Sequence, residues 1–360
     1  MSGVNNNTKM DGPVDAVVRS IDRRVAVAPM MDWTDRHCRF FLRLFSPSVL
    51  LYTEMIHAAA IVRGARSRLL GFSAEEQPLA IQLGGSDPAQ LAEAARIAVD
   101  LGYSEVNLNC GCPSDKVQAG SFGACLMAQP ALVAECVAAM KAAVAVPVTV
   151  KLRVGIVARG GAAEAIDAAA AAERFDEQDW LSLSAFASGL VAAGADALIV
   201  HARKAVLGGW SPQENRSVPP LQFGVVERLR GALPGMPVVV NGGIRDVTAA
   251  VAAMDRFDGI MIGREAYHRP WLLWEIHQAL HVGADAAPSM QQILAAMAAY
   301  AAREQCNGTR LHAITRHMLG LLAGRPGARE LRSLLSAEVQ RGLAADEVFS
   351  RAKDIAAQAA

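Results

Sequence analysis

The sequence predicts an α/β protein, a (β/α)₈ TIM barrel followed by a small all-helical C-terminal domain. Eight short apolar runs recur along the chain, and amphipathic segments of helical period separate them. The 360 residues suit a barrel of about 250 residues with an appendage. The alternative is an open doubly wound sheet, which would normally show Gly-x-Gly-x-x-Gly after a strand, and the sequence has none.

The expected strands are mostly continuous apolar runs, as in parallel strands buried on both faces. They lie at residues 25–29, 50–55, 79–83, 105–109, 147–153, 197–203, 237–241 and 259–263. Helical patterns at residues 88–101, 130–144 and 248–254 fall between them, and residues 265–280 supply the last helix of the barrel. Eight such units in sequence indicate a barrel.

The remaining segments define the domain boundaries. Residues 1–19 are polar and Asn-rich, so we expect a flexible N-terminus, with the barrel at residues 20–281. An Ala/Gly-rich stretch at residues 157–176 interrupts the barrel, and we interpret it as an insertion without chemistry. Beyond a linker, residues 289–358 have a helical pattern throughout, and we expect this small domain to dock on the barrel.

Composition excludes several classes of protein. Lys plus Arg is 35 and Asp plus Glu is 35, so any attraction to nucleic acid must come from local basic clusters. The six cysteines form no secreted disulfide framework, which indicates reduced thiols in the cytoplasm. We expect no metal site, since Cys110-x-Cys112 has no second ligand pair. We also expect no membrane span, no signal peptide, and a monomer.

Polar residues follow almost every expected strand. Since the carboxyl ends of barrel strands meet at one mouth, we expect these side chains to converge on a site there. Taken alone, Lys151 is equally consistent with a salt-bridge partner, and His201 with a core histidine. The residues at the strand ends include Pro29, Met30, Met31, Gln82, Asn109, Lys151, His201, Asn241 and Arg264.

Glycines follow the seventh and eighth strands, where TIM barrels commonly bind phosphate. Gly242 and Gly243 follow Asn241, and Gly263 precedes Arg264. Glycines allow backbone N–H groups to approach a phosphate, and an arginine adds a bidentate donor. A simple turn remains the alternative for Gly242-Gly243. The repetition at both positions favours a phosphate group of a cofactor or substrate.

Cys112 lies in a tight loop directly after the fourth strand. Gly111 permits unusual backbone angles and Pro113 cannot donate to a strand ladder, so the strand ends before them. A rigid strand end is a position where α/β enzymes hold reactive side chains. The local pattern leaves two interpretations open, a catalytic cysteine and a small buried hydrophobic residue.

Several long motifs together resemble the tRNA-dihydrouridine synthase family, and specifically its DusA branch. The motifs occupy residues 28–39, 51–55, 82–86, 111–114, 201–205, 211–216, 241–244 and 315–320. The similarity runs from about Val25 to Ser336. The chain departs from the family pattern in its 157–176 insertion, in its tail after Ala337, at Cys110 and at Gln213.

The resemblance implies reduction of the C5–C6 double bond of D-loop uridines at tRNA positions 20 and 20a, with bound FMN reduced by NADPH. In this interpretation Cys112 gives a proton to C5, a role that needs the thiol rather than the thiolate. The residues implied to hold FMN are Pro29, Met30, Met31, Gln82, Lys151, His201, Asn241, Gly242, Gly243, Gly263 and Arg264. Those implied to contact tRNA are Asn109, Gln213, Arg216, Arg329 and Arg332.

Two other functions remain open at this point. One is an FMN oxidoreductase that acts on a free pyrimidine, similar to dihydroorotate dehydrogenase, which would not need the helical domain. The other is a tRNA-binding protein without turnover, which would need neither Cys112 nor Lys151. Dependence on tRNA separates the first from the family function, and bound flavin with NADPH oxidation would exclude the second.

Overall fold

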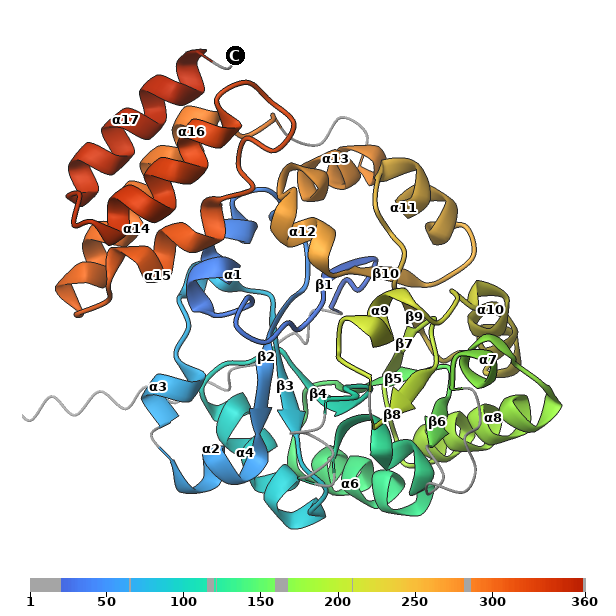
Figure 1. Cartoon of the computed structure of the whole chain (residues 1–360). Coiled ribbons are helices and arrows are strands. Elements are labelled where there is room, and N and C mark those ends of the chain that lie inside the picture. The colour runs from blue at the N-terminus through green and yellow to red at the C-terminus, as the bar shows by residue number, and fades with distance from the viewer. Residues whose placement is uncertain are drawn as a thin grey trace, which may run out of the picture.

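The computed structural model describes residues 21–64, 66–114, 120, 122–158, 168–208, 210–281 and 286–358. Within them eight parallel strands form one sheet in the order β1-β10-β9-β7-β5-β4-β3-β2. An Ala26–Leu50 bridge joins β1 to the segment entering β2 and closes the sheet, which confirms the predicted TIM barrel (Figure 1). The strands are β1 (Val25–Val27), β2 (Leu51–His57), β3 (Leu79–Gly84), β4 (Glu105–Cys110), β5 (Val148–Arg153), β7 (Ala197–His201), β9 (Val238–Asn241) and β10 (Gly259–Ile262).

Helices cover the outside of the barrel, where their apolar faces meet the strands (Figure 1). Several begin at a residue that the sequence supplies for capping: Asp35 and Asp87 accept from backbone N–H groups of α1 and α4. The barrel helices are α1 (Arg36–Arg43), α2 (Ala58–Arg63), α3 (Arg66–Leu70), α4 (Pro88–Asp100), α6 (Pro130–Ala143), α8 (Glu177–Ala192), α9 (Glu214–Ser217), α10 (Phe223–Ala232), α11 (Val247–Met254), α12 (Arg264–His268) and α13 (Trp271–Leu280). The single helix expected at 265–280 is therefore two helices, separated at Arg269-Pro270.

A second, two-stranded sheet lies in the region expected to be an insertion. β6 (Ile156–Ala158) pairs in parallel with β8 (Ala205–Leu207), so Val157 belongs to a strand opposite Val206. α7 (Ala168–Glu173) follows, and the Ala171 carbonyl accepts a hydrogen bond from Lys204 at 3.3 Å. Residues 159–167, like the N-terminal 1–20, lie outside the described residues. The described parts of the 157–176 segment, in β6 and α7, thus both contact residues 204–207, which follow β7.

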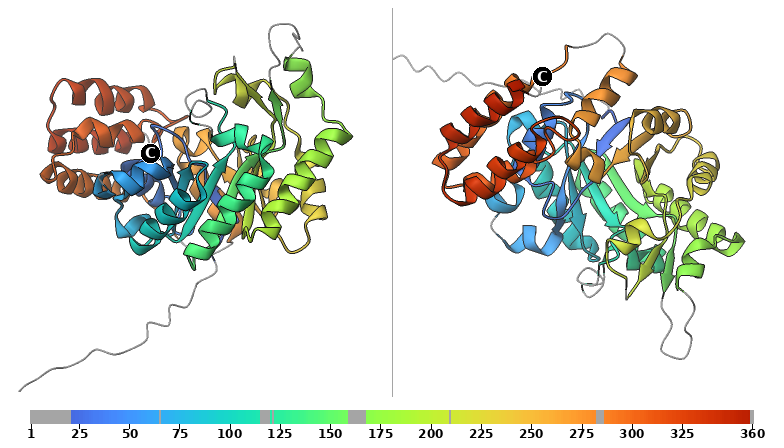
Figure 2. Two further views of the ribbon diagram at one scale, coloured as in Figure 1. Left: turned by 90° about the horizontal axis from the view of Figure 1, so that it is seen from below. Right: turned by 45° about the horizontal axis from the view of Figure 1, so that its top comes forward.

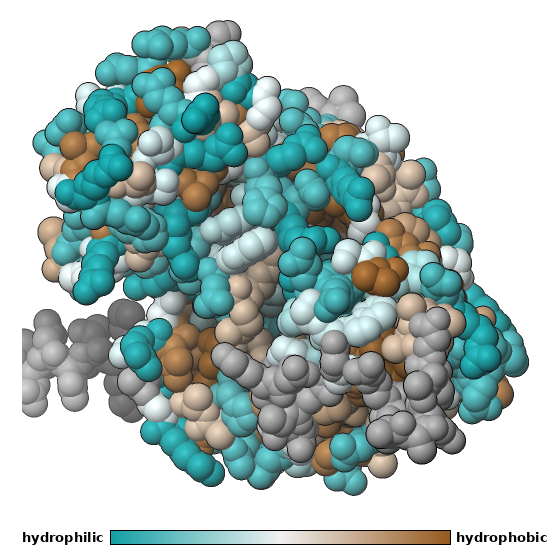
Figure 3. All heavy atoms as spheres, viewed as in Figure 1, coloured by the Kyte–Doolittle hydropathy of each residue, from teal (hydrophilic) through white to brown (hydrophobic). Residues whose placement is uncertain are grey.

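The C-terminal helices are α14 (Met290–Cys306), α15 (Leu311–Thr315), α16 (Ala328–Ser333) and α17 (Ala345–Gln358), with one 3₁₀ turn at Arg316–Met318 and a π-helical turn at Leu334–Glu338. Ser289 and Gln292 form a capping box at the start of α14. Both views of Figure 2 show these helices packed as one block against the side of the barrel, next to α1. Hydrophilic residues cover most of their outer face (Figure 3).

The helical block and the barrel share one hydrophobic core. Phe40 of α1 stacks on Tyr300 of α14 with ring centroids 4.0 Å apart, and the Tyr300 hydroxyl lies 2.7 Å from His37 Nδ1. Trp271 Nε1 donates to the Leu321 carbonyl at 2.9 Å. These contacts bury apolar side chains from both parts in a single cluster, so the expected docking is confirmed. None of the helices in the described ranges is long and apolar enough to cross a membrane.

Candidate active site

The strand register brings the predicted polar residues to one end of the barrel. Asn109 of β4 is paired with Lys151 of β5, and Arg153 of β5 is paired with His201 of β7. His201 is in turn paired with Asn241 of β9. Because all eight strands are parallel, these pairings place the side chains at neighbouring positions around the carboxyl-terminal mouth.

Cys112 lies half-buried in the loop that follows β4, and backbone hydrogen bonds fix that loop. Asn109 Oδ1 accepts from the N–H groups of Gly111 and Cys112, each at 3.0 Å. The Cys112 carbonyl accepts from Ala124 N at 2.9 Å, and the Cys112 Sγ lies 3.6 Å from Ser114 Oγ. By contrast Cys110 is fully buried, and burial raises the pKa of its thiol. Cys112 is therefore the member of the pair that can meet a substrate.

Arg153 follows Lys151 at the end of β5, where we expect polar residues of the site, but the sequence assigns it no cofactor or substrate role. It is 3% exposed, and its guanidinium donates to three carbonyls, those of Gly111 at 3.0 Å, Lys204 at 3.1 Å and Asn215 at 2.9 Å. These carbonyls belong to the Cys112 loop and to the two segments that follow β7. Burial lowers the pKa of Arg153 to about 9, but three acceptors hold the cation. Arg153 thus ties the Cys112 loop to the rim of the barrel.

Asn215 explains why this rim segment is rigid. Its side chain is fully buried, accepts from Val206 N at 2.7 Å and donates to the Val206 carbonyl at 3.1 Å. The neighbouring residues Gln213 and Arg216 are exposed on the rim, at and within α9. The 211–216 motif therefore anchors one residue in the core and presents its neighbours to solvent.

Lys151 and His201 occupy an electropositive, partly desolvated region. Burial and the charge of Arg153 lower the pKa of Lys151 to about 7, although Cys112 acts in the opposite direction. Burial, Arg153 and Lys151 hold the pKa of His201 well below its ordinary value, so its imidazole is neutral at pH 7. Lys151 forms no ion pair with an acid among the described residues, which leaves it available to an anionic ligand.

More arginines gather at the mouth than the sequence motifs indicated. Burial lowers the pKa of Arg203, and the charges of Arg245 and Arg264 lower it further. Burial lowers the pKa of Arg216 as well, with a further contribution from Arg264. None of these four arginines pairs with an acid within the described part of the chain, whereas Arg228 and Arg230 of α10 and Arg256 after α11 do. A chain with no net charge thus has one positively charged mouth.

The two glycines after β9 are required by their backbone angles and surroundings, whereas the glycine after β10 is not. Gly242 and Gly243 have φ values of 104° and 77°, and a Cβ on them would lie 2.8 Å from His201 Cδ2 and 2.5 Å from Leu221 Cδ1 respectively. Gly263 is open, with Ala28 Cβ and Met30 Sδ each 3.9 Å from where a Cβ would be. The end of β9 therefore packs closely against His201 of β7 and Leu221, and the end of β10 lies beside the residues that follow β1.

The turn after β1 contributes an apolar surface. Pro29 and Met30 are half-buried there, and Met30 N donates to Thr34 Oγ1 at 2.9 Å. Met31 is 56% exposed, the highest value for a large hydrophobic side chain in the described ranges. Met30, whose Sδ lies near Gly263, and the exposed Met31 give this turn an apolar surface suited to a flat ring.

Arg329 and Arg332 are not brought to the mouth. Both are exposed on α16, where Arg332 Nε donates to the Ala328 carbonyl of its own helix at 3.1 Å. Figure 1 shows α16 within the C-terminal block, apart from the strand ends. An arginine of this block that does contact the turn after β1 is Arg316, which donates to the Asp32 carbonyl and lies 3.2 Å from the Asp35 carboxylate.

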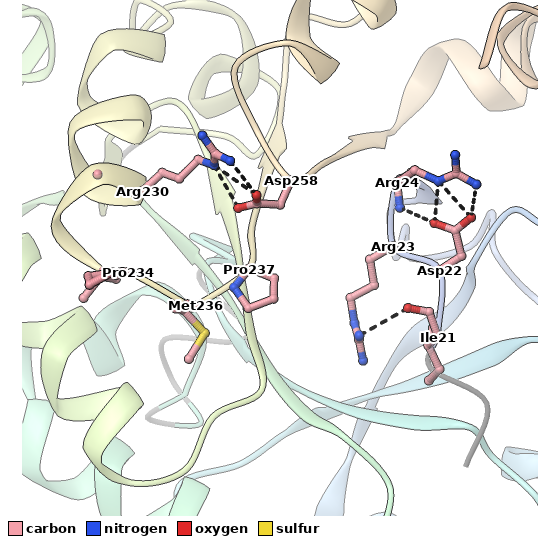
Figure 4. A pocket seen from close by; sticks show the side chains of 12 residues that line it. Ile21, Asp22, Arg23, Arg24, Arg230, Pro234, Met236, Pro237 and Asp258 are labelled. Carbon is pink, nitrogen blue, oxygen red and sulfur yellow. Dashed lines mark hydrogen bonds and ion pairs between the residues drawn. The ribbon is translucent and has the colours of Figure 1, made fainter. Parts of the chain in front are cut away.

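A cavity of about 840 Å³ lies at the opposite end of the barrel, where β1, β9 and β10 begin (Figure 4). Its charged groups are satisfied locally: Arg24 pairs with Asp22, and Arg230 pairs with Asp258 at 2.8 Å. Figure 4 shows these pairs facing the cavity from two sides. Polar groups at the amino ends of barrel strands serve stability more often than catalysis. Nowhere in the described ranges do three or more His, Cys, Asp or Glu side chains gather to hold a metal ion.

The model of the family "Dihydrouridine synthase (Dus)" matches residues 26–357 of this chain. The chain belongs to the dihydrouridine synthase family. A protein of Xanthomonas campestris pv. campestris named tRNA-dihydrouridine(20/20a) synthase is 50% identical over 329 residues, which cover 91% of this chain and 92% of that protein. Proteins of the same name from Pseudomonas putida and Pseudomonas aeruginosa are 48% and 47% identical, over 92% and 94% of this chain and 94% and 96% of their own.

The family assignment confirms the resemblance found in the motifs. A solved structure of a morphinone reductase variant in complex with tetrahydroNAD covers 75% of this chain and 90% of its own, with 13% identity and a TM-score of 0.46. That likeness is too weak to support an argument about the ligand. The fold is instead established by the closed parallel sheet.

The mouth fits a flavin mononucleotide on its own chemistry. Gly242 and Gly243 after β9 present backbone without a side chain, Gly263 after β10 is uncrowded, and the cations beside them are unpaired within the described residues. Met31 offers an apolar surface, and Gln82 and Lys151 offer polar groups within the same ring of strands. The expected cofactor residues from β1, β3, β5, β7, β9 and β10 thus lie around one opening.

Proposed function

We propose that this protein reduces the C5–C6 double bond of uridine in the D loop of tRNA to 5,6-dihydrouridine, at positions 20 and 20a. FMN is the bound cofactor and NADPH the reductant. The observation that supports this most directly is the half-buried Cys112, held by Asn109 and Arg153 at a mouth whose cations are unpaired. Such a mouth suits both a flavin phosphate and the phosphates of RNA.

FMN would be held by residues that the strand ends bring together. Gly242, Gly243, Gly263 and Arg264 would receive its phosphate, and Met30 with Met31 would face its ring. Pro29, Gln82, Lys151, His201 and Asn241 complete the set. When bound, FMN supplies a hydride to C6 of the uracil, and that hydride comes from NADPH.

Cys112 supplies the other hydrogen. Its thiol donates a proton to C5, so that hydride and proton together saturate the double bond. The thiolate that remains recovers a proton from solvent through the open mouth. Lys151 balances negative charge next to this reaction, and its unusually low pKa means that it becomes fully protonated only when an anion is near. Neutral His201 can orient a polar group as a donor or an acceptor.

The uridine must leave its stack to reach Cys112, at a cost of a few kcal/mol. Arg216 stands on the rim between the mouth and solvent, so we assign it, with Gln213, to the backbone of the tRNA near the flipped base. Arg329 and Arg332 on α16 would contact tRNA farther from the reacting base. We also infer a monomer, and a location in the cytoplasm, the location because the six cysteines are free.

The decisive experiment compares tRNA with free uridine as the substrate. Protein loaded with FMN is reduced with NADPH under anaerobic conditions and then mixed with unmodified tRNA or with free uridine. We expect flavin reoxidation and dihydrouridine at positions 20 and 20a with tRNA alone. Reoxidation by free uridine at a comparable rate would instead identify an enzyme of free pyrimidines.

A matched pair of variants tests the phosphate site. Arg264→Ala removes a charge-assisted pair worth about 1.5–3 kcal/mol, so FMN affinity should fall about tenfold to a hundredfold. Arg269→Ala removes an exposed arginine five positions farther on, whose guanidinium donates to the Arg245 carbonyl, and should retain FMN. Equal FMN affinity in both variants would place the phosphate elsewhere.

A further inference from the structure

A line of buried polar side chains crosses the interior of the barrel and ends at the Cys112 loop. Five consecutive hydrogen bonds connect Cys112 N to Asn109, Asn109 to Gln82, Gln82 to Asn107, Asn107 to Thr149, and Thr149 to Glu105, at 3.0, 2.8, 2.8, 2.9 and 2.6 Å. The five side chains come from β3, β4 and β5 and are all nine-tenths or more buried. The proposed function uses Asn109 and Gln82 of this line, and leaves Asn107, Thr149 and Glu105 without a role.

The line has a single direction, because both of its ends are fixed. At one end, Glu105 Oε1 accepts from the hydroxyls of Tyr52 at 2.5 Å and Thr149 at 2.6 Å, while Oε2 binds Arg23 at 2.6 Å. Three donors converging on these oxygens require a carboxylate, which can only accept. At the other end stand the N–H groups of Gly111 and Cys112, which can only donate.

Each amide between these ends has one allowed orientation. Thr149 must donate to Glu105, so its oxygen accepts from Asn107 Nδ2. The Asn107 Oδ1 then faces Gln82 Nε2, and the Gln82 Oε1 faces Asn109 Nδ2. Asn109 Oδ1 is left to hold the Cys112 loop. An amide oxygen and nitrogen have nearly the same shape, so this sequence of donors and acceptors is what orients them.

We propose that Glu105 and Thr149 are positioning residues for catalysis: through Asn107, Gln82 and Asn109 they fix the place of Cys112 from the opposite end of the barrel interior. This rests on the proposed function, since it assigns Cys112 the proton for C5. The same line fixes which polar atom Gln82 can offer to a flavin. A displacement of about 1 Å at a reacting group can cost on the order of 100-fold in rate.

Thr149→Val is the sharpest test because it removes only the hydroxyl of a fully buried side chain. Asn107 Nδ2 then loses its acceptor inside the barrel, so the Asn107, Gln82 and Asn109 amides must shift to find other partners, and the Cys112 loop moves with Asn109 Oδ1. We expect single-turnover tRNA reduction to fall about 10- to 100-fold. KM for tRNA should stay unchanged, and NADPH should still reduce FMN.

Thr315→Val is the matched control, since Thr315 is also fully buried and donates to a carbonyl, that of Leu335 at 2.7 Å. It should lower thermal stability as Thr149→Val does and leave single-turnover tRNA reduction unchanged. Thr149→Ser keeps the hydroxyl and should restore the rate. Glu105→Gln, which can donate where Glu105 only accepts, should resemble Thr149→Val in its rate.

Amide hydrogen exchange supplies a readout that does not depend on activity. The Gly111 and Cys112 amides are protected by Asn109 Oδ1, so Thr149→Val should accelerate their exchange and Thr315→Val should not. Unchanged exchange together with an unchanged rate in Thr149→Val would overturn the positioning role. If the wild-type protein reduces no tRNA uridine while exchange accelerates in Thr149→Val, the line holds the loop and the proposed function is what fails.

Discussion

The Asp35 carboxylate lies 3.2 Å from the Arg316 guanidinium, although the two residues belong to opposite ends of the chain. Asp35 caps α1 in the barrel, and Arg316 follows α15 in the C-terminal block. The same guanidinium donates to the Asp32 carbonyl, and Asp32 has a φ of 64°. The turn after β1, which carries Met30 and Met31, is therefore held in part by the helical block.

We expect Arg316→Ala to weaken FMN binding although Arg316 does not line the mouth. Loss of the guanidinium releases the Asp32 carbonyl and loosens the turn that we propose to face the flavin ring. The measurement is the FMN dissociation constant by fluorescence quenching. Arg325→Ala is the control. Arg325 belongs to the same helical block, but its guanidinium lies over the ring of Trp271 in α13 and not at that turn. Equal FMN affinity in Arg316→Ala and wild type would contradict this coupling.

Asp35 should also make stability depend on acid pH. Burial alone would raise the pKa of Asp35, but His317, the nearby Cys38 N–H and the charge of His37 lower it to about 2. A lowered carboxyl pKa stabilises the folded state above about pH 4, by about 2 kcal/mol, and this contribution is lost as the pH falls toward 2. Asp35→Asn should flatten the unfolding free energy between those values in urea titrations. An identical acid slope in the variant would show that other carboxyls cause it.

Much of the fold could be predicted because buried parallel strands leave a strong apolar signal. All eight expected runs contain a strand of the barrel, from Val25–Val27 to Gly259–Ile262. The pair Ile156–Ala158 and Ala205–Leu207 was missed because each short strand directly follows a longer expected strand, at residues 147–153 and 197–203, and shows no separate apolar run. Part of the expected insertion therefore belongs to ordered structure next to the mouth.

The site also has residues that the sequence could predict and residues that it could not. Residues at strand ends could be predicted because topology alone brings them together. The role of Arg153 could not, since its partners are backbone carbonyls of three separate segments, which no side-chain pattern reveals. The Asp35–Arg316 contact was equally hidden, because it joins distant parts of the chain that only docking brings together.

Substitutions of the two neighbouring cysteines should separate the two half-reactions. Cys112→Ala should reduce tRNA uridine about 10²–10⁴-fold more slowly, since general acid catalysis contributes that much, while NADPH oxidation persists. Cys110→Ala should keep tRNA reduction and lose some stability, because its fully buried sulfur packs against the core. Single-turnover flavin reoxidation by tRNA is the measurement. If both variants lost it equally, Cys112 would not be the specific proton donor.

FMN affinity should fall as the pH rises above neutrality. In the flavin-free protein Lys151 has a pKa of about 7, so above that pH it is mostly neutral and must take up a proton to face an anion. One coupled proton limits the effect to about tenfold per pH unit. Titrations between pH 7.5 and 9 should show this slope. Lys151→Arg stays charged throughout and should abolish it, so a slope that survives in this variant would point to another group.

The exposed arginines of α16 should contribute to tRNA affinity through phosphate contacts alone. Arg329 and Arg332 are three positions apart and form no ion pair with an acid in the described part of the chain. Since the chain has no net charge, its attraction to tRNA must come from such local groups. Arg329→Glu with Arg332→Glu should weaken binding and flatten the dependence of log K on log salt by roughly one to two units.

The control for this double variant is Arg228→Glu, which changes an arginine already paired with Glu177 on the outer surface of the barrel. It should leave both tRNA affinity and the salt slope unchanged. NADPH should reduce FMN normally in the wild type, in Arg228→Glu and in the double variant, because none of these changes alters the proposed cofactor site. If affinity and slope stayed at wild-type values in Arg329→Glu with Arg332→Glu while Arg216→Glu lowered both, the phosphate contacts would belong to the barrel rim, and the helical block would act on tRNA only by holding the turn after β1.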